Sequence, residues 1–339
     1  MSSFIARVLI AMSMMSGLFL VSERSEGGEP VKLIFDTDMG NDIDDALALG
    51  VIHALQTRKE CELICVTSSK DNPFSSQFCD LVNTFYGRGA IPVGAVVNGK
   101  TPEAGKYTQG PVEATDEGKV RYPRTHEVYP EAVSLLRKTL AAQPDQSVAI
   151  VTVGFSTNIA RLLDSPGDEA SPLKGIDLVK QKVRLLSIMA GMFTAEGRHK
   201  EYNVYIDIDA AKKVYADWPT PIVASGFEIG LAIEYPASSI SKDFNYVEHH
   251  PLSEAYPLYI KFPYDRPTWD LTSVLYAVRP DHGYFGISKP GLISVDDQMV
   301  TQFAESEGGR DRYLTVTPEQ IVRVKEALIQ LASQPPCSR

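Results

Sequence analysis

Five aspartates lie within ten consecutive residues near the start of the folded region. They are Asp36, Asp38, Asp42, Asp44 and Asp45. Carboxylates this close repel one another, so a fold tolerates them only where a cation or a bound proton offsets their charge. Calcium suits such a group because it takes six to eight oxygen ligands at about 2.3–2.6 Å. The cluster therefore predicts a calcium site.

The acidic run lies between a predicted strand and a predicted helix. Residues 31–35 are apolar, as in a buried strand. Helical spacing of apolar residues begins after Asp44 and includes Leu47 and Val51. Open α/β sheets bind ligands at the carboxyl ends of their strands, which is where this run begins. Capping of the helix would explain one or two of the aspartates, but not five.

Strands and helices alternate along the rest of the chain. We expect further strands at residues 62–68, 91–97, 147–153, 183–190 and 221–225. We expect helices at residues 75–86, 131–142, 157–163, 210–216 and 318–332. This alternation predicts one α/β domain over residues 31–335, with a mostly parallel, doubly wound, Rossmann-like open sheet and helices on both faces. Residues 101–130 are expected to form a long loop and residues 240–270 an embellishment of the domain.

Composition limits the partners and the location of the protein. The 339 residues carry a net charge of −10, which argues against nucleic acid as a partner. Residues 8–21 are almost wholly apolar but too few to span a bilayer comfortably, which takes about 20 residues. We therefore expect a signal peptide at residues 1–22, a disordered lead at 23–30 and a periplasmic or secreted location. The membrane would be a partner only if this segment stays uncleaved, and a homo-oligomer is left open.

Two other patterns carry little weight. Residues 94–101 match the phosphate-binding consensus G-x-x-x-x-G-K-[ST], but two valines fill the loop and no helical pattern follows Pro102. The four cysteines do not predict disulfides or a zinc site. In an extended strand the α-carbons of Cys61 and Cys65 would lie about 13 Å apart, too far for a bond between them. We expect the cysteines to be mostly buried thiols.

Three later segments each have an ordinary structural explanation when taken alone. They are residues 152–160 (T-V-G-F-S-T-N-I-A), 201–203 (E-Y-N) and 269–270 (W-D). Glu201 and Asn203 could belong to a surface turn. Trp269 could be a packing residue, and Asp270 could cap a helix. Their order along the chain, behind the acidic run, makes a joint functional interpretation the stronger one.

Together with the acidic run, these segments resemble the inosine–uridine-preferring nucleoside hydrolase family. Its members bind calcium on a D-x-D-x-G-x-D-D-type motif and hydrolyse the N-glycosidic bond of ribonucleosides. The resemblance implies that Asp38 is a calcium ligand and the base for the attacking water. It also implies that Asp45 is a bidentate calcium ligand and that Asp44 holds a ribose hydroxyl. Two extra residues follow Gly40 here, so Asp42 could share or exchange duties with Asp44.

The same resemblance supplies the rest of the calcium shell. The backbone carbonyl of Val153 would complete the shell, with Asp270 as its last carboxylate. Asp38, Asp45 and Asp270 would then converge on one ion although they lie far apart in the sequence.

Substrate contacts follow from the resemblance as well. Glu201 and Asn203 would reach the ribose hydroxyls, and Asn72 would be a further sugar-side residue. Trp269 looks like the purine-preferring branch, in which an aromatic ring stacks on the leaving base. Stacking on Trp269 alone accelerates the reaction too little. A second aromatic ring, for which Tyr107 is a candidate, or solvent would have to help.

These residues imply a calcium-dependent enzyme that releases ribose and a free base from a small ribonucleoside. The same ligands would serve an exported, calcium-stabilised protein that only captures nucleosides or sugars. An aspartate-dependent phosphatase is a third interpretation. It fits less well, because Gly40 occupies the last position of the motif D-x-D-x-[TV].

Overall fold

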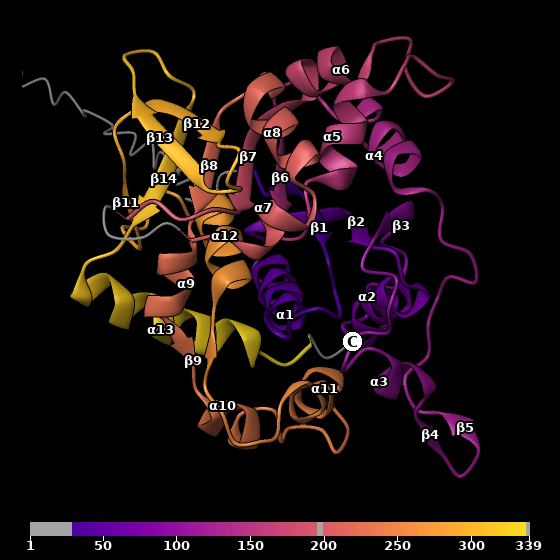
Figure 1. Cartoon of the computed structure of the whole chain (residues 1–339). Coiled ribbons are helices and arrows are strands. Elements are labelled where there is room, and N and C mark those ends of the chain that lie inside the picture. The colour runs from indigo at the N-terminus through magenta and orange to yellow at the C-terminus, as the bar shows by residue number, and fades with distance from the viewer. Residues whose placement is uncertain (1–28, 195–198, 337–339) are drawn as a thin grey trace, which may run out of the picture.

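The computed structural model describes residues 29–194 and 199–336, which are built around one central sheet (Figure 1). Its strands are β1 (Val31–Thr37), β2 (Cys61–Lys70), β3 (Val93–Lys100), β6 (Val148–Thr152), β7 (Val183–Met189), β8 (Ile222–Ser225), β11 (Gly286–Ile287), β12 (Gly291–Val295), β13 (Thr301–Glu305) and β14 (Asp311–Thr315). They lie in the order β13-β12-β14-β8-β7-β6-β1-β2-β3, with β11 paired to β14. Neighbours from β14 to β3 are parallel, whereas β11, β12 and β13 pair in antiparallel fashion. The predicted mostly parallel sheet is confirmed.

Helices cover both faces of this sheet, as predicted. In β1, Leu33 and Phe35 pack into one core, and Ile34, which points the other way, packs into a second. The helices on the first core include α1 (Asp44–Thr57), α2 (Pro73–Phe85), α12 (Trp269–Val278) and α13 (Pro318–Ala332). The helices on the second core include α4 (Ala132–Ala141), α5 (Thr157–Asp164), α6 (Gly175–Lys182) and α8 (Ile208–Asp217). Strands buried on both faces explain why their sequences read as continuous apolar runs.

The order of the strands reverses at β1, which pairs with β2 on one side and β6 on the other. Such a switch point opens a crevice at the carboxyl ends of the two strands. Gly154 lets the turn after β6 approach the end of β1 closely. A Cβ atom at this glycine would lie 2.5 Å from the backbone nitrogen of Asp38, which no side chain could accommodate. The acidic run and residues 152–160 therefore meet at this crevice.

Smaller elements complete the described chain. They are α3 (Gln109–Glu113), β4 (Thr115–Asp116), β5 (Lys119–Val120), α7 (Tyr202–Ile206), α9 (Phe227–Ala232), β9 (Glu234–Tyr235), α10 (Ala237–Lys242), α11 (Pro251–Tyr259) and β10 (Arg266–Pro267). Residues 101–130 are mostly irregular, as expected, but contain α3 and the β4–β5 hairpin. The expected embellishment at 240–270 contains α11 and runs directly into α12.

The sequence pattern does not predict helix α12, which was considered only as a helix that Asp270 could cap. Every residue from Asp270 to Val278 is buried, so the helix shows no polar face and no clear helical periodicity. Helix α13, by contrast, has one apolar face and a capping box between Thr317 and Gln320. That helix was correctly predicted.

The remaining predictions concern the phosphate-binding consensus, the cysteines and the N-terminal segment. The segment that matches the phosphate-binding consensus lies almost entirely in strand β3, so its rejection is confirmed. Cys61, Cys65 and Cys79 are buried free thiols, as expected. The predicted signal peptide, nearly all of the predicted lead and Cys337 lie outside the described residues. Within the described ranges, no helix is both long and apolar enough to cross a membrane.

Candidate active site

The acidic run forms a tight turn between the end of β1 and the start of α1. Gly40 has a φ of +114°, a conformation that other residues rarely adopt. Its N–H donates to the hydroxyl of Tyr107 (2.9 Å), and that hydroxyl donates to the carbonyl of Asp42 (2.6 Å). Tyr107 is fully buried behind the turn. It shapes the turn and cannot stack on a ligand, so its prediction as a second aromatic platform was wrong.

Three carboxylates converge below this turn. Asp44, Asp45 and Asp270 each place an oxygen within 4.8 Å of the others, and all three are buried. Asp44 accepts the backbone N–H of Asp270 (3.1 Å), and one Asp45 oxygen accepts the hydroxyl of Thr37. The other Asp45 oxygen is buried and has no hydrogen-bond partner among the described residues. A buried, unpartnered carboxylate oxygen facing two more carboxylates fits a hard cation.

The pKa values of these three aspartates also show that burying neighbouring negative charges is unfavourable. Burial raises the pKa of Asp44, Asp45 and Asp270 well above the usual range. Neighbouring carboxylates raise them further: Asp42 acts on Asp44, Asp38 on Asp45, and Asp44 on Asp270. Without a cation, the cluster is therefore driven to hold protons.

Asp38 lies in the same cavity and is held by a buried network. Its Oδ2 accepts the side-chain amide of Asn41 (2.8 Å), and the amide oxygen of Asn41 accepts Lys70 Nζ (2.9 Å). Burial raises the pKa of Asp38 to about 7. Its charge also raises the pKa of Asp45 and of Asp270. The predicted base thus lies beside the three carboxylates but is not one of the three that lie within 4.8 Å of one another.

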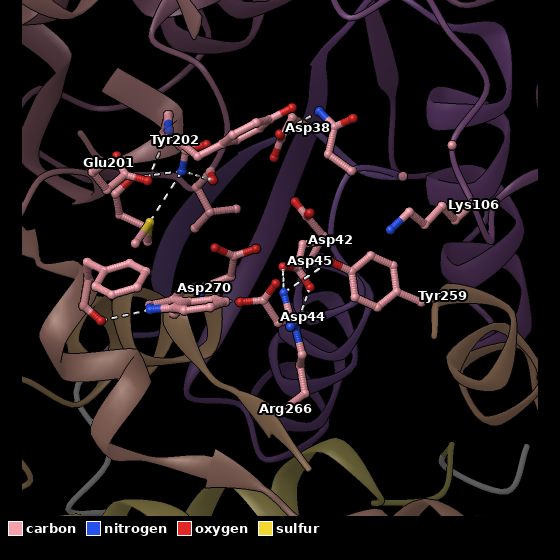
Figure 2. Close-up of a pocket in the computed structure, with 18 of the residues that line it drawn as sticks. Asp38, Asp42, Asp44, Asp45, Lys106, Glu201, Tyr202, Tyr259, Arg266 and Asp270 are labelled. Atoms are coloured by element: carbon pink, nitrogen blue, oxygen red, sulfur yellow. Dashed lines mark hydrogen bonds and ion pairs between the residues drawn. The ribbon is translucent and has the colours of Figure 1, made fainter. Parts of the chain in front are cut away.

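The two extra residues of the acidic run place Asp42 against a cation of the chain. Asp42 forms an ion pair with Arg266 of β10, with Nε and Oδ1 at 2.9 Å (Figure 2). Asp44, rather than Asp42, then joins the carboxylate group. The geometry thus separates the two residues whose roles the sequence left interchangeable.

The sugar-side residues predicted from the sequence fall into two groups. Glu201 and Asn203 line the cavity, and Asn203 donates to the carbonyl of Val153 (2.7 Å). Val153 lines the cavity, and its carbonyl oxygen has a second lone pair. Glu201 caps α7 and accepts the backbone N–H groups of Asn203 (3.0 Å) and Gly191 (3.1 Å); burial raises its pKa to about 7. Asn72 is not among the described residues that line the cavity, because it caps α2 instead.

Aromatic rings also line the cavity. Trp269 stacks on Phe227 (5.2 Å between ring centroids) and donates its indole N–H to the carbonyl of Phe227 (2.8 Å). The Arg266 guanidinium lies 5.1 Å from the Trp269 ring centroid and 4.9 Å from that of Tyr259. Gly230 leaves room for the indole, since a Cβ atom there would lie 2.5 Å from Trp269 Cα. This wall can bind a flat ring.

The acidic and aromatic walls enclose one cavity of about 580 Å³. In Figure 2 the labelled aspartates surround its floor, and Tyr259 and Lys106 approach from the side. Its volume suits a small molecule with a sugar on the acidic floor and an aromatic ring against Trp269.

Comparisons with known proteins identify the family to which the chain belongs. The family model described as inosine-uridine preferring nucleoside hydrolase matches residues 33–324. The chain belongs to this family. It is therefore an N-ribosyl hydrolase of the glycosidase class, and the resemblance seen in the sequence is confirmed.

Solved structures share the fold of this nucleoside hydrolase. The inosine-uridine preferring nucleoside hydrolase from Bacillus anthracis has a TM-score of 0.67 at 19% identity, over 89% of this chain and 99% of its own. The purine-preferring ribonucleoside hydrolase from Gardnerella vaginalis has a TM-score of 0.66 at 18% identity, over 89% and 98%. The type III effector protein XopQ, complexed with adenosine diphosphate ribose, has a TM-score of 0.63 at 16% identity, over 90% and 93%. No curated protein matches the sequence.

Asp36 holds the nucleoside hydrolase strands together and does not line the cavity. Its carboxylate accepts the hydroxyls of Thr67 (2.6 Å) and Thr152 (3.0 Å) and the side-chain amide of Asn158 (2.8 Å). These contacts tie β1 to β2, β6 and α5. Asn158 of the T-N-I-A segment therefore has a structural role. Asp36 belongs to the acidic run but does not line the cavity.

Three residues that line the cavity, Arg266, Tyr259 and Phe227, follow no recognisable motif and were not predicted. Lys70, which contacts the cavity residue Asn41, was not predicted either. A cation close behind a strand end, such as Lys70 at the end of β2, is the one signal that could have been used.

Stability of the ion-free protein should fall as the pH rises. The pKa of Asp36 is raised to about 6 and that of Asp38 to about 7, mainly by burial. A carboxyl group whose pKa is higher in the folded state than the unfolded value stabilises the fold below that unfolded pKa and loses this contribution through the folded pKa. With chelator present, the melting temperature should therefore drop between about pH 5 and about pH 7.5.

A divalent cation should reverse this loss, because it binds the deprotonated carboxylates. Added cation should raise the melting temperature more at the higher pH than at the lower one, as measured by scanning calorimetry. The Asp45→Asn variant should respond much less. A melting temperature that rises with pH under chelation, or that ignores the cation, would contradict this electrostatic account.

Proposed function

We propose that this protein is a calcium-dependent hydrolase of purine ribonucleosides, releasing ribose and the free base. One observation supports this most strongly: Asp44, Asp45 and Asp270 converge with an unpartnered buried oxygen, and Asp38 lies beside them in the same cavity. Family membership supports ribonucleoside hydrolysis itself. The identity of the ion and the preferred base are proposed from the chemistry of the walls.

The donor set favours calcium over other metals. Asp44, Asp45, Asp270 and the Val153 carbonyl offer only oxygen atoms, and Asp38 adds another carboxylate nearby. Zinc and copper prefer nitrogen and sulfur ligands, whereas calcium accepts six to eight oxygens in flexible geometry. When bound, calcium supplies positive charge that orients the sugar hydroxyls and keeps the surrounding carboxylates ionised.

Asp38 is proposed as the general base. Water attacks the anomeric carbon, and its proton passes to Asp38. The bond between that carbon and the base nitrogen breaks with its electron pair leaving on the base, which takes up a proton from solvent. Burial raises the pKa of this carboxyl group in the ion-free protein, and a cation bound beside it would lower that pKa again. The sugar gains positive charge in the transition state, and the fixed carboxylates of the floor stabilise that charge.

The leaving base would lie against the aromatic wall. Stacking on Trp269 stabilises a base that gains a proton by about 0.5–2 kcal/mol, which accelerates the reaction by at most about thirtyfold. Tyr259 supplies the second ring that Tyr107 cannot, and it lies beside the same guanidinium as Trp269. A purine would contact more of the Trp269 ring than a pyrimidine would, because its ring system is larger.

Ribose release tests the proposed function. The wild-type protein with calcium should release ribose from inosine, and chelator should stop release until calcium is restored. Asp38→Asn should lower kcat by about 10²–10⁴-fold, the usual contribution of a general base, and should leave inosine binding largely intact. Reducing-sugar assays and equilibrium binding measure the two quantities.

A matched control is Asp297→Asn, which changes a fully exposed aspartate away from the cavity and should keep wild-type kcat. Wild-type turnover in Asp38→Asn would refute the assignment of the base. Inosine binding by the wild-type protein without any ribose release would instead support a nucleoside-binding protein. Release that persists under chelation would refute the calcium dependence.

Replacing the aromatic wall should affect substrates unequally. Trp269→Ala should slow inosine and guanosine by about ten- to thirtyfold, because the leaving purine loses its stacking partner. A riboside with an activated leaving group, such as 4-nitrophenyl riboside, needs no such help and should slow by less than about threefold. The measurement is kcat/KM for both substrates, and an equal loss on both would show that Trp269 only shapes the cavity.

A further inference from the structure

Lys70, the last residue of β2, is a lysine that the fold buries almost completely. Only 2% of the residue is exposed. Burial lowers its pKa. An ammonium group removed from water destabilises a fold unless hydrogen bonds and negative charge compensate for the lost hydration. The groups that contact the Lys70 ammonium therefore indicate why the fold buries it.

Two of these partners are close hydrogen-bond acceptors. Lys70 Nζ donates to the side-chain oxygen of Asn41 (2.9 Å) and to the carbonyl of Thr101 (2.8 Å). The carboxylate of Glu103 lies farther away, at 3.6 Å, and its side chain is 66% exposed. Glu103 is the nearest negative charge, and it raises the pKa of Lys70 against the effect of burial. The two short hydrogen bonds of the buried ammonium go to Asn41 and Thr101.

The ammonium fixes the orientation of the Asn41 amide. It is a donor without an acceptor, so it binds the amide oxygen and never the amide nitrogen. The nitrogen must then face the other way, where it donates to Asp38 Oδ2 (2.8 Å) and to the Thr101 hydroxyl (3.3 Å). A chain of two hydrogen bonds thus runs from a buried cation to one oxygen of Asp38.

This chain constrains the proposed base. One carboxylate oxygen of Asp38 is occupied by the amide of Asn41, which leaves the other oxygen to accept a proton. The positive charge at the far end of the chain also favours the ionised carboxylate over its neutral form. Both effects act on Asp38, the side chain that contacts the reacting water in the proposed reaction. Lys70 itself does not contact that water.

We propose that Lys70 is a positioning residue for the hydrolysis, acting through Asn41 to orient the Asp38 carboxylate. This inference rests on the proposed function, since it assigns Lys70 to the base of that reaction. The alternative is a purely structural role, in which Lys70 only anchors the backbone at Thr101. A structural anchor would affect folding and binding, whereas a positioning residue affects the chemical step.

Steady-state kinetics of the calcium-loaded enzyme with inosine separate these roles. Lys70→Met keeps a long apolar side chain but removes the donor, and Asn41→Leu breaks the chain at its centre. Each variant should lower kcat by about 10- to 100-fold, the effect expected for a hydrogen bond to a charged group, with KM changed by less than about threefold. The double variant should lose no more than the worse single variant, because both changes break one chain.

Lys32→Met is the matched control. Lys32 lies at the amino end of β1, whereas the cavity lies at the carboxyl ends of the strands. It pairs with Glu62 at the surface, so kcat should stay at the wild-type value. A Lys70→Met enzyme with wild-type kcat would overturn the inference. So would losses in the two single variants that add fully in the double variant, or a change confined to KM and melting temperature.

Crystal structures of wild type and Lys70→Met provide a readout that does not depend on turnover. The Asp38 carboxylate should rotate or occupy several conformers in the variant. If the wild-type protein releases no ribose from any riboside, the proposed function fails and this comparison alone decides the positioning role. An Asp38 carboxylate that keeps the same single conformer in both structures would overturn the inference.

Discussion

Repulsion among buried carboxylates is the constraint on which the rest of this structure depends. The fold places Asp44 and Asp45 at the start of one helix and Asp270 in the first turn of another, and buries all three. No hydrogen bond from the described residues reaches the second oxygen of Asp45. Such an arrangement destabilises the protein unless a cation compensates for it, so its presence indicates a function rather than a contribution to stability.

Two cations of the chain offset part of this charge. Arg266 pairs directly with Asp42, and Lys70 acts on Asp38 through an intervening amide. Three of the five aspartates that line the cavity remain, and a divalent cation offsets two of their charges. The carboxylates that line the cavity suit a reaction whose transition state carries positive charge on the sugar ring.

The sequence was most informative where residues close in the chain are also close in space. The acidic run, the strand before it and the helix after it were all predicted, because periodicity and charge density are local properties. The partners of that run were not, since Arg266 lies 224 residues beyond Asp42 and the pairing depends on tertiary structure. Tyr107 was wrongly taken for a ligand platform and Asn72 was expected in the cavity, because burial and capping cannot be read from residue type alone.

Calcium binding measured by isothermal titration calorimetry tests the convergence of these carboxylates most directly. The proposed function predicts one calcium ion per chain, bound by wild type and by Asp42→Asn, because the Asp42 side chain pairs with Arg266 instead. Binding should be lost or greatly weakened in Asp45→Asn and in Asp270→Asn, although the two residues lie on different helices. Unchanged affinity in Asp270→Asn, or no calcium bound by the wild-type protein, would contradict the account.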